Sequence, residues 1–555
     1  MKCSVSAVFR ARATELLPGP SSRGPVPGAA RFAQLCAGMC PIVDLFGATS
    51  DNRAVANPDR LTALDSTFLH LEDHSAAHMH VASVMVFEGE APTLKELVEH
   101  VMGRLHLVPR YRQRLAYVPF GQGRPVWTDD PHFNPYYHIR HTALPKPAGE
   151  EALKRLAGRI FSQRLDRSKP LWEIWLVQSM SGGRFALIAK THHALVDGIS
   201  GVDITTVLFD TAREPAAPTA PATPWAAKPL PGQAKLLGEA LVERSTVPGE
   251  MFRGARAVLR RPRRAVSRFT GALASVGATT LAGIQAPAPA SPFNVEIGPH
   301  RRYTFLDVDI ASLKAVKDSL GGTLNDTVLA SVSLALGRYL RRHGHKTDDL
   351  VLKAMVPVSV RTKAQRGALG NQVAAMWAPL PVGVENAAEV LRKIAASMDD
   401  LKKSGQAVGA QVLTNLAGFA PPTILSQAAR LQARQPFFNL VVTNVPGPQF
   451  PLYLLGRRLE ILYPVVPLAQ KQALGIAVMS YDGHLGFGLL GDYDALPDIE
   501  ELALDLKWAV AALCRAAGVR PRVGSTRKAT PKRTTSSSRR NSNSRAGARR
   551  PAGTN

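Results

Sequence analysis

Cysteine is scarce in this chain of 555 residues, which contains four of them. Cys3, Cys36 and Cys40 lie near the N-terminus, and Cys514 lies near the C-terminus. So few and so scattered cysteines argue against a disulfide framework and are typical of a reducing compartment. Cys36 and Cys40 are spaced like half of a zinc site, but the chain has no second half. We therefore expect no bound metal at these positions.

Long apolar runs are also missing. No segment approaches the roughly 20 consecutive apolar residues that a helix needs to cross a bilayer. Hydrophobic residues make up 45% of the chain and charged residues 20%, which is typical of a globular protein. The length predicts two core-forming units with extensions. The missing apolar runs predict that the chain has no transmembrane helix.

Acidic side chains are few: 43 Asp and Glu stand against 68 Lys and Arg, for a net charge of +25. From Arg520 to the C-terminus there are eleven basic residues and no acid. A second basic group, called the arginine cluster below, consists of Arg253, Arg256, Arg260, Arg261, Arg263, Arg264 and Arg268. Such charge suits phospholipid surfaces, nucleic acid or phosphate-bearing cofactors. Because the tail has no aromatic side chain to stack on bases, we expect no specific nucleic-acid partner.

Several catalytic motifs are absent, among them the Gly-x-Ser-x-Gly elbow, the phosphate loop and His-Glu-x-x-His. Gly486 to Gly491 matches the dinucleotide pattern Gly-x-Gly-x-x-Gly, but it falls inside the second strand of a predicted hairpin, where the required βαβ context is missing. His70, His74 and His78 have helical spacing that suggests a metal site, but no further ligand completes it. We expect neither a nucleotide cofactor nor a metal.

Composition and periodicity divide the chain into five segments. Two of them alternate predicted strands and amphipathic helices, which indicates two α/β units, and the others are rich in Pro, Ala, Ser or Arg. The predicted segments are 1–58, a disordered extension in which Met39 is a plausible true start; 59–210, the first α/β lobe; 211–300, a Pro/Ala-rich linker with a basic amphipathic helix; 301–517, the second lobe; and 518–555, a disordered basic tail.

Two adjacent histidines follow the most strand-like segment of the first lobe. The apolar run from Phe185 to Lys190 predicts a strand, and His192 and His193 stand at its end, with Asp197 and Gly198 as a turn shortly after. An imidazole at a strand end is firmly held and titrates near neutral pH, as a general base requires. The alternative is a pair of surface histidines beside a turn.

The stretch His192-His193-Ala-Leu-Val-Asp197-Gly198 resembles the His-His-x-x-x-Asp-Gly signature of acyltransferases built like chloramphenicol acetyltransferase. Further stretches resemble the bacterial wax ester synthase/diacylglycerol acyltransferases, and they occur in family order. These are Leu64-Asp-Ser-Thr-Phe68, Met79-His-Val81, Val108-Pro-Arg110, Leu165-Asp-Arg-Ser-Lys-Pro-Leu-Trp-Glu173, Leu324-Asn-Asp326, Pro357-Val-Ser-Val-Arg361 with Gly370-Asn-Gln372, and Asn444-Val-Pro-Gly-Pro448. The resemblance implies an α/β fold of two similar lobes that form a pseudo-dimer, with the active site in a tunnel at their interface.

The resemblance also implies a reaction, in which an acyl group passes from a long-chain acyl-CoA to the hydroxyl of diacylglycerol or of a fatty alcohol. His193 would be the base, Asp197 and Gly198 would shape the turn, and His192 would orient the surroundings of His193. Asn325 is a candidate oxyanion donor, although it also suits a helix cap, as do Thr323 and Asp326. Acyl-CoA is a substrate, so no cofactor is expected.

The same resemblance, with the positive charge, implies a cytoplasmic enzyme that contacts anionic membrane or lipid droplets peripherally. The arginine cluster suits that contact, and a solvated linker helix is the alternative. Two other functions stay open at this point: a relative that acylates another acceptor, as in peptide condensation or polyketide acylation, and a non-catalytic lipid- or nucleic-acid-binding relative.

Overall fold

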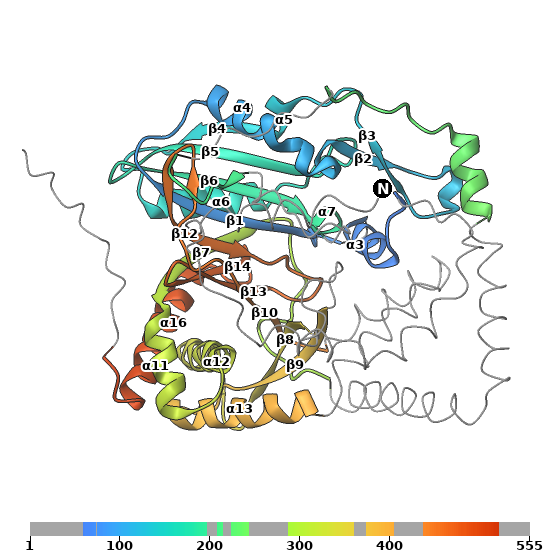
Figure 1. Cartoon of the computed structure of the whole chain (residues 1–555). Coiled ribbons are helices and arrows are strands. Elements are labelled where there is room, and N and C mark those ends of the chain that lie inside the picture. Colours follow the sequence, from blue (N-terminus) through green and yellow to red (C-terminus); the bar gives the residue numbers. More distant parts are fainter. Residues whose placement is uncertain are drawn as a thin grey trace, which may run out of the picture. The chain divides into compact units, whose positions relative to one another are not determined.

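The computed structural model describes residues 59–73, 75–196, 208–214, 224–242, 287–359, 373–403 and 437–520 (Figure 1). The predicted N-terminal extension, the arginine cluster and nearly all of the basic tail lie outside these residues. The described part is a mixed α/β structure built on two six-stranded sheets.

The first sheet has the strand order β11-β12-β1-β6-β5-β4. Its strands are β1 (His80–Glu88), β4 (Ile139–Ala143), β5 (Trp172–Met180), β6 (Arg184–His192), β11 (Tyr453–Leu454) and β12 (Arg457–Val465). Strands β4 and β5 are parallel, and the other neighbours are antiparallel. β11 and β12 come from the second half of the sequence, so the two halves share this sheet.

The second sheet has the order β7-β14-β13-β10-β8-β9. Its strands are β7 (Arg301–Asp309), β8 (Val351–Ser359), β9 (Val373–Pro381), β10 (Leu440–Pro446), β13 (Leu474–Tyr481) and β14 (His484–Asp492). The predicted hairpin joins β13 to β14 through Asp482 and Gly483, with φ of 41° and 89°. Positive φ at both positions is what a tight two-residue hairpin turn requires. A third, two-stranded sheet pairs β2 (Gln113–Ala116) with β3 (Val126–Asp129).

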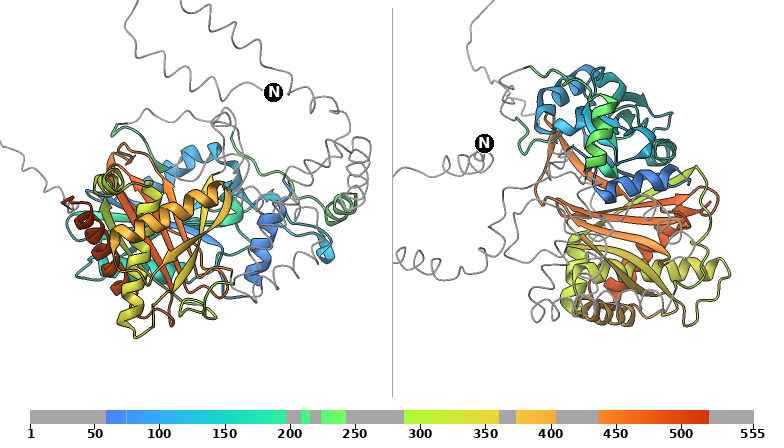
Figure 2. Two further views of the ribbon diagram at one scale, coloured as in Figure 1. Left: turned by 90° about the horizontal axis from the view of Figure 1, so that it is seen from below. Right: turned by 90° about the vertical axis from the view of Figure 1, so that its right-hand side faces the viewer.

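Helices cover the sheets (Figure 2). Those of the first half are α3 (Ala63–Asp73), α4 (Leu94–Arg104), α5 (Pro135–His138), α6 (Glu150–Phe161) and α7 (His193–Val196), with short 3₁₀ helices at Leu105–Leu107, Pro109–Arg112 and Pro119–Gly121. A further helix spans 233–242. Those of the second half are α11 (Ile310–Leu320), α12 (Leu324–Arg342), α13 (Ala387–Lys403) and α16 (Ile499–Ala516). The strand predicted from Phe185 to Lys190 is confirmed, and it lies within β6.

Three apolar cores hold these layers. One lies between the second sheet and its four helices, and one lies on the outer face of the first sheet, under α4. The third joins the two halves, because side chains of the first sheet and of α6 pack there against β7 and β14. Its members include Val84, Val86, Ile188, Tyr303, Phe305 and Leu490. Burial of this apolar surface fixes the two halves against one another.

The glycines of the Gly-x-Gly-x-x-Gly segment have a structural role. Gly486 and Gly488 lie on one face of β14, where a Cβ atom would overlap the backbone carbonyl oxygens of Leu462 and Pro464 in β12. Glycine therefore permits a close approach of strands from the two sheets. The segment is a hairpin strand, as predicted, and has no βαβ context.

Asp498 occupies the N-cap position of α16 but makes no capping hydrogen bond with its side chain. Its carboxylate instead accepts a hydrogen bond from the Tyr339 hydroxyl at 2.7 Å and lies 2.6 Å from Nε2 of His343. Competition from the C-terminal end of α12 thus takes the carboxylate away from its own helix.

Candidate active site

His193 stands at the end of an interior strand of the first sheet. Strand β6 ends at His192, and α7 begins at His193. The backbone N–H of His193 donates to the carbonyl oxygen of Met79 at 2.8 Å, which ties this turn to the residue just before β1. The imidazole is half-buried, and its ring lies against the ring of Phe68 from α3, with centroids 4.6 Å apart. The side chain is therefore held but still accessible, as a general base must be.

His192 has different surroundings. It is 1% exposed, and its Nε2 lies 3.3 Å from Oε1 of Glu72. Its Nδ1 accepts a hydrogen bond from the backbone N–H of Ala194 at 3.1 Å. In a neutral imidazole this leaves the proton on Nε2, facing the carboxylate. Of the two histidines, His192 faces the interior and His193 is the more exposed.

Glu72, in the last turn of α3, is a buried carboxylate beside this strand end. Its Oε1 accepts a hydrogen bond from the Met79 N–H at 2.6 Å, and its Oε2 accepts one from Arg167 Nη2 at 2.9 Å. Burial raises the pKa of Glu72, but His192 first and then His80 and Arg167 outweigh burial and hold the pKa well below its usual range. Glu72 is therefore ionised at neutral pH.

His80 lies on the other side of the same carboxylate, with Nε2 3.7 Å from Oε1 of Glu72. Burial, followed by the charge of Lys190, lowers the pKa of His80 well below its ordinary value, so this imidazole is neutral. Glu72 could not be recognised from the sequence, because one acid on an amphipathic helix carries no signal of its partners. Arg167, which lies in one of the family-like stretches, was the nearest available signal.

A second buried ion pair lies between β6 and its other neighbouring strand, β5. Lys190 is 1% exposed, and its Nζ lies 2.6 Å from Oε1 of Glu173 in β5. The same Nζ donates to the carbonyl oxygens of Ile160 at 2.9 Å and Gln163 at 2.8 Å. These contacts connect β6 to β5 and to the end of α6, two residues before His192.

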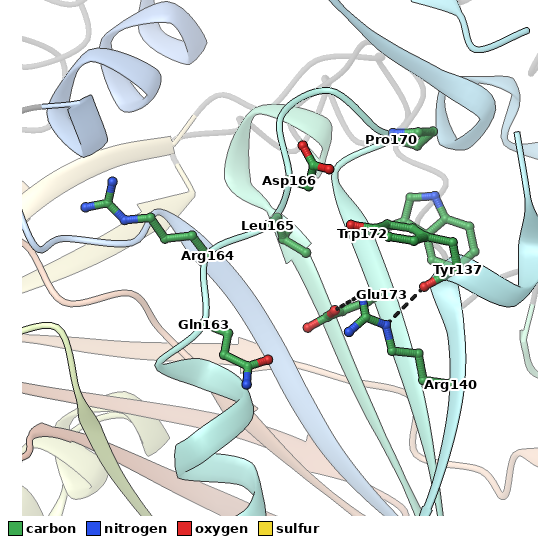
Figure 3. A pocket seen from close by; sticks show the side chains of 9 residues that line it. All are labelled: Tyr137, Arg140, Gln163, Arg164, Leu165, Asp166, Pro170, Trp172 and Glu173. Carbon is green, nitrogen blue, oxygen red and sulfur yellow. Dashed lines mark hydrogen bonds and ion pairs between the residues drawn. The ribbon is translucent and has the colours of Figure 1, made fainter. Parts of the chain in front are cut away.

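A pocket of about 270 Å³ opens next to this pair (Figure 3). Its wall is formed largely by the family-like stretch from Leu165 to Glu173, together with Gln163, Arg164, Tyr137 and Arg140. Arg140 faces Glu173, with Nη2 3.4 Å from Oε2, and donates from Nε to the Tyr137 carbonyl oxygen at 3.0 Å. The lining carries two arginines, Arg140 and Arg164, and two acids, Asp166 and Glu173, so its formal charges cancel.

Asn325 is the second residue of α12, and it is not the cap of that helix. Thr323 is the N-cap, with its hydroxyl accepting from the Asp326 N–H at 3.2 Å and the Asp326 carboxylate accepting from the Thr323 N–H at 2.8 Å. The Asn325 Oδ1 accepts instead from Nδ2 of Asn444 in β10 at 3.4 Å. Two asparagines from family-like stretches far apart in sequence are thus brought together, and helix capping is removed as the reason for Asn325.

The structure describes only some of the other predicted residues. Asp197 and Gly198 lie outside the described residues, and so does His74 of the histidine series. The remaining two members of that series differ: His70 is exposed, whereas burial and then Arg301 lower the pKa of buried His78 to about 4. Within the described ranges, one group of three side chains could hold a metal ion by spacing: His343, Asp498 and Glu501, at the far end of α12 from Asn325.

Among the residues that the structure describes, no helix has both the length and the apolar character needed to cross a bilayer.

Comparison with known proteins identifies two matching domain families. Residues 61–328 match the wax ester synthase/diacylglycerol acyltransferase catalytic domain, and residues 369–513 match the C-terminal domain of the same proteins. The probable diacylglycerol O-acyltransferase tgs1 of Mycobacterium tuberculosis is 32% identical over 464 residues, which cover 82% of this chain and 96% of the relative. The probable diacylglycerol O-acyltransferase tgs2 of the same organism is 33% identical over 471 residues, covering 83% and 100%.

Among solved structures, the fold is similar to that of a wax ester synthase/diacylglycerol acyltransferase from Marinobacter aquaeolei VT8. The TM-score is 0.59 and the sequence identity 27%, over 83% of this chain and 100% of the other. The expected two-lobed α/β architecture is thereby confirmed.

Proposed function

The chain belongs to the wax ester synthase/diacylglycerol acyltransferase family, and we propose that it moves a long-chain acyl group from acyl-CoA to the hydroxyl of diacylglycerol, with His193 as the base. The family accounts for acyl-CoA and an alcohol as the substrates. The residue roles below are our proposal, and they start from the half-buried imidazole at the end of β6.

In this mechanism, His193 takes the proton of the acceptor hydroxyl while the hydroxyl oxygen attacks the thioester carbon. The resulting tetrahedral intermediate collapses, the C–S bond breaks, and the CoA thiolate leaves with the proton that His193 carried. The products are the ester and free CoA, and His193 is restored. Proton transfer of this kind contributes roughly 10²–10⁴-fold to the rate.

The developing oxyanion needs a hydrogen-bond donor. We assign that role to the amide N–H of Asn325, because its Oδ1 accepts from Asn444 while Thr323 caps the helix. Such a donor contributes about 10²–10³-fold. His192 is a positioning residue, since its ring is buried against Glu72. Asp197 and Gly198 lie outside the described residues, and the role we propose for them is the one expected from the sequence, to shape a turn close to the base.

The observation that carries the proposal is the contrast between the two adjacent histidines. The test supplies purified full-length protein with a long-chain acyl-CoA and diacylglycerol, a fatty alcohol or no acceptor, and measures free CoA and ester. His193→Ala should lose at least about 10²-fold in rate. His70→Ala, an exposed histidine on α3, should keep the parental rate. A His193→Ala variant at the parental rate would refute the assignment of the base.

Comparing the reaction with diacylglycerol to the reaction with a fatty alcohol separates the two activities of the family. We propose diacylglycerol as the main acceptor, because the probable diacylglycerol O-acyltransferases of M. tuberculosis match nearly their whole length. The fatty alcohol tests wax ester synthesis as a second activity. CoA release that is equally fast without any acceptor would identify a thioesterase and contradict the proposal.

We also propose that the enzyme reaches its water-insoluble acceptor by peripheral contact with an anionic membrane or a lipid droplet, at the inner face of the membrane. The net charge of +25 supports attraction to anionic lipid. An exposed apolar site supports insertion: Phe120, at the tip of the β2–β3 hairpin, is 87% exposed, and Leu241 in helix 233–242 is 51% exposed. That helix packs onto the hairpin, since a Cβ at Gly123 would lie 2.8 Å from Cβ of Ala240.

Vesicle sedimentation tests this contact. We expect that replacing all seven arginines of the arginine cluster by Ser releases the protein from anionic vesicles, and that Phe120→Asp weakens binding as well. Binding to neutral vesicles should be weak throughout. If both variants sediment with anionic vesicles as the parent does, the proposed surface is wrong.

A further inference from the structure

We propose that Glu72 is a positioning residue for His193: it fixes the strand end that carries the base and does not itself touch the substrate. The inference rests on the acyl transfer proposed above, with His193 as the base. It concerns how the imidazole is held in place, which the family resemblance leaves open.

The first oxygen of Glu72 holds Met79, the residue whose carbonyl oxygen accepts the backbone hydrogen bond of His193. Oε1 accepts the N–H of Met79 at 2.6 Å, and the carbonyl oxygen of Met79 accepts the N–H of His193 at 2.8 Å. Oε1 also lies 3.3 Å from Nε2 of His192, the residue bonded covalently to His193. One oxygen atom therefore constrains the backbone of His193 from both sides.

The second oxygen anchors the carboxylate itself. Oε2 accepts from Arg167 Nη2 at 2.9 Å. The same guanidinium donates to the Leu69 carbonyl oxygen at 2.9 Å and to Asp73 Oδ1 at 2.5 Å. Arg167 lies between α6 and β5, so the carboxylate joins three separate segments: the end of α3, the start of β1 and the connection into β5. Both oxygens are engaged, which fixes the rotation of the carboxylate.

A carboxylate is the group that meets these demands. Glu72 is 2% exposed, and a charge buried so deeply persists only where donors satisfy it on all sides. Gln has the same shape, but it presents one acceptor and one donor. One orientation of the amide turns its NH₂ toward the Arg167 guanidinium, and the other turns it toward the Met79 N–H. Either orientation loses one of the two contacts.

The consequence for the reaction follows from the distances. If Oε1 no longer holds the N–H of Met79, the backbone of Met79 is free to move. The carbonyl oxygen that accepts from His193 then moves with it, and the imidazole shifts relative to the acceptor hydroxyl. A displacement near 1 Å costs up to about 10²-fold in rate. Binding of acyl-CoA does not depend on this contact, because Glu72 is buried behind His192.

The test compares Glu72→Gln with Asp73→Asn in the full-length protein. Asp73 is the matched control, since it is the next residue of α3 and pairs with the same Arg167 but is half exposed and has no contact with Met79 or His192. For each variant we would measure kcat, KM for acyl-CoA, and the number and affinity of palmitoyl-CoA sites by equilibrium dialysis. We expect Glu72→Gln to lose about 10- to 100-fold in kcat with parental KM, affinity and number of sites, and Asp73→Asn to match the parent.

Three results would overturn the inference. Glu72→Gln could keep the parental kcat; it could lose binding sites in proportion to kcat, which is the pattern of a residue needed for folding alone; or Asp73→Asn could lose as much as Glu72→Gln. If Glu72→Gln does not fold, Glu72→Asp retains the charge but is shorter by one methylene, and a parental kcat in that variant would equally overturn the inference. An active His193→Ala refutes the proposed base, whereas an inactive His193→Ala with a fully active Glu72→Gln refutes the role of Glu72 alone.

Discussion

Replacing the buried lysine of the strand that carries the base should destabilise the protein strongly. In Lys190→Met, the apolar part of the side chain is largely preserved, so the cavity that results is small. The variant loses the 2.6 Å ion pair with Glu173 and the hydrogen bonds to the carbonyl oxygens of Ile160 and Gln163. Burial lowers the pKa of Lys190, and Glu173 opposes that shift, so the charged amine depends on its partner.

The size of the loss in stability follows from the buried charge that remains on Glu173. Glu173 is 5% exposed, and after the substitution its one remaining ion-pair partner among the described residues is Arg140, at 3.4 Å. Removing one partner of a buried ion pair costs about 3–5 kcal/mol, because the other charge stays buried. We expect the free energy of unfolding to fall by that amount.

Equilibrium urea unfolding, followed by tryptophan fluorescence and by far-UV circular dichroism, measures this loss. A double-mutant cycle with Glu173→Gln should show that the two substitutions together cost less than the sum of their single effects, by about 1–3 kcal/mol. Lys95→Met, on an exposed lysine of α4, is the control and should stay within about 0.5 kcal/mol of the parent. A Lys190→Met variant as stable as Lys95→Met would refute the reasoning.

Three further predictions concern the second half of the chain. Asn325→Ala should lower kcat about 10²–10³-fold while leaving the urea midpoint unchanged, and a parental kcat would exclude Asn325 as the oxyanion donor. The carbonyl oxygen of Tyr339 is the largest cause of the raised pKa of His343. The charged imidazole therefore stabilises the fold fully below about pH 6.5, and this stabilisation disappears as pH rises through the raised pKa. The melting temperature of the parent should fall in that window relative to that of His343→Gln, and parallel curves of melting temperature against pH would contradict this. Gly488→Ala should cost about 1–3 kcal/mol of stability, because its Cβ meets the Pro464 carbonyl oxygen; Gly238→Ala, where nothing lies within 4 Å, is the control, and equal stability of the two variants would show that the strands separate freely.

Local patterns predicted most of the elements near the site. Alternating apolar residues located β6, and the two histidines at its end were recognised as the candidate base and its neighbour. The Tyr481-Asp-Gly483 turn indicates the β13–β14 hairpin, because few residues other than Gly, Asn and Asp tolerate the positive φ that such a turn needs. In each case the signal and its structural consequence lie within about ten residues of one another.

Long-range pairing was not predictable in the same way. β11 and β12 join the first sheet through register with β1, more than 350 residues away, and no local pattern specifies that partner. Glu72 and Lys190 look like ordinary surface charges in sequence, since their burial depends on partners from other segments. Asp498 is a residue type that suits a helix N-cap, but Tyr339 and His343, distant in sequence, bind its carboxylate instead.

The most direct test of the central claim is triacylglycerol formation in a single reaction. Purified protein, labelled palmitoyl-CoA and diacylglycerol in anionic vesicles should yield triacylglycerol and free CoA in equal amounts, and His193→Ala should reduce both together by at least about 10²-fold. CoA release without triacylglycerol, or triacylglycerol formation by His193→Ala at the parental rate, would contradict the account.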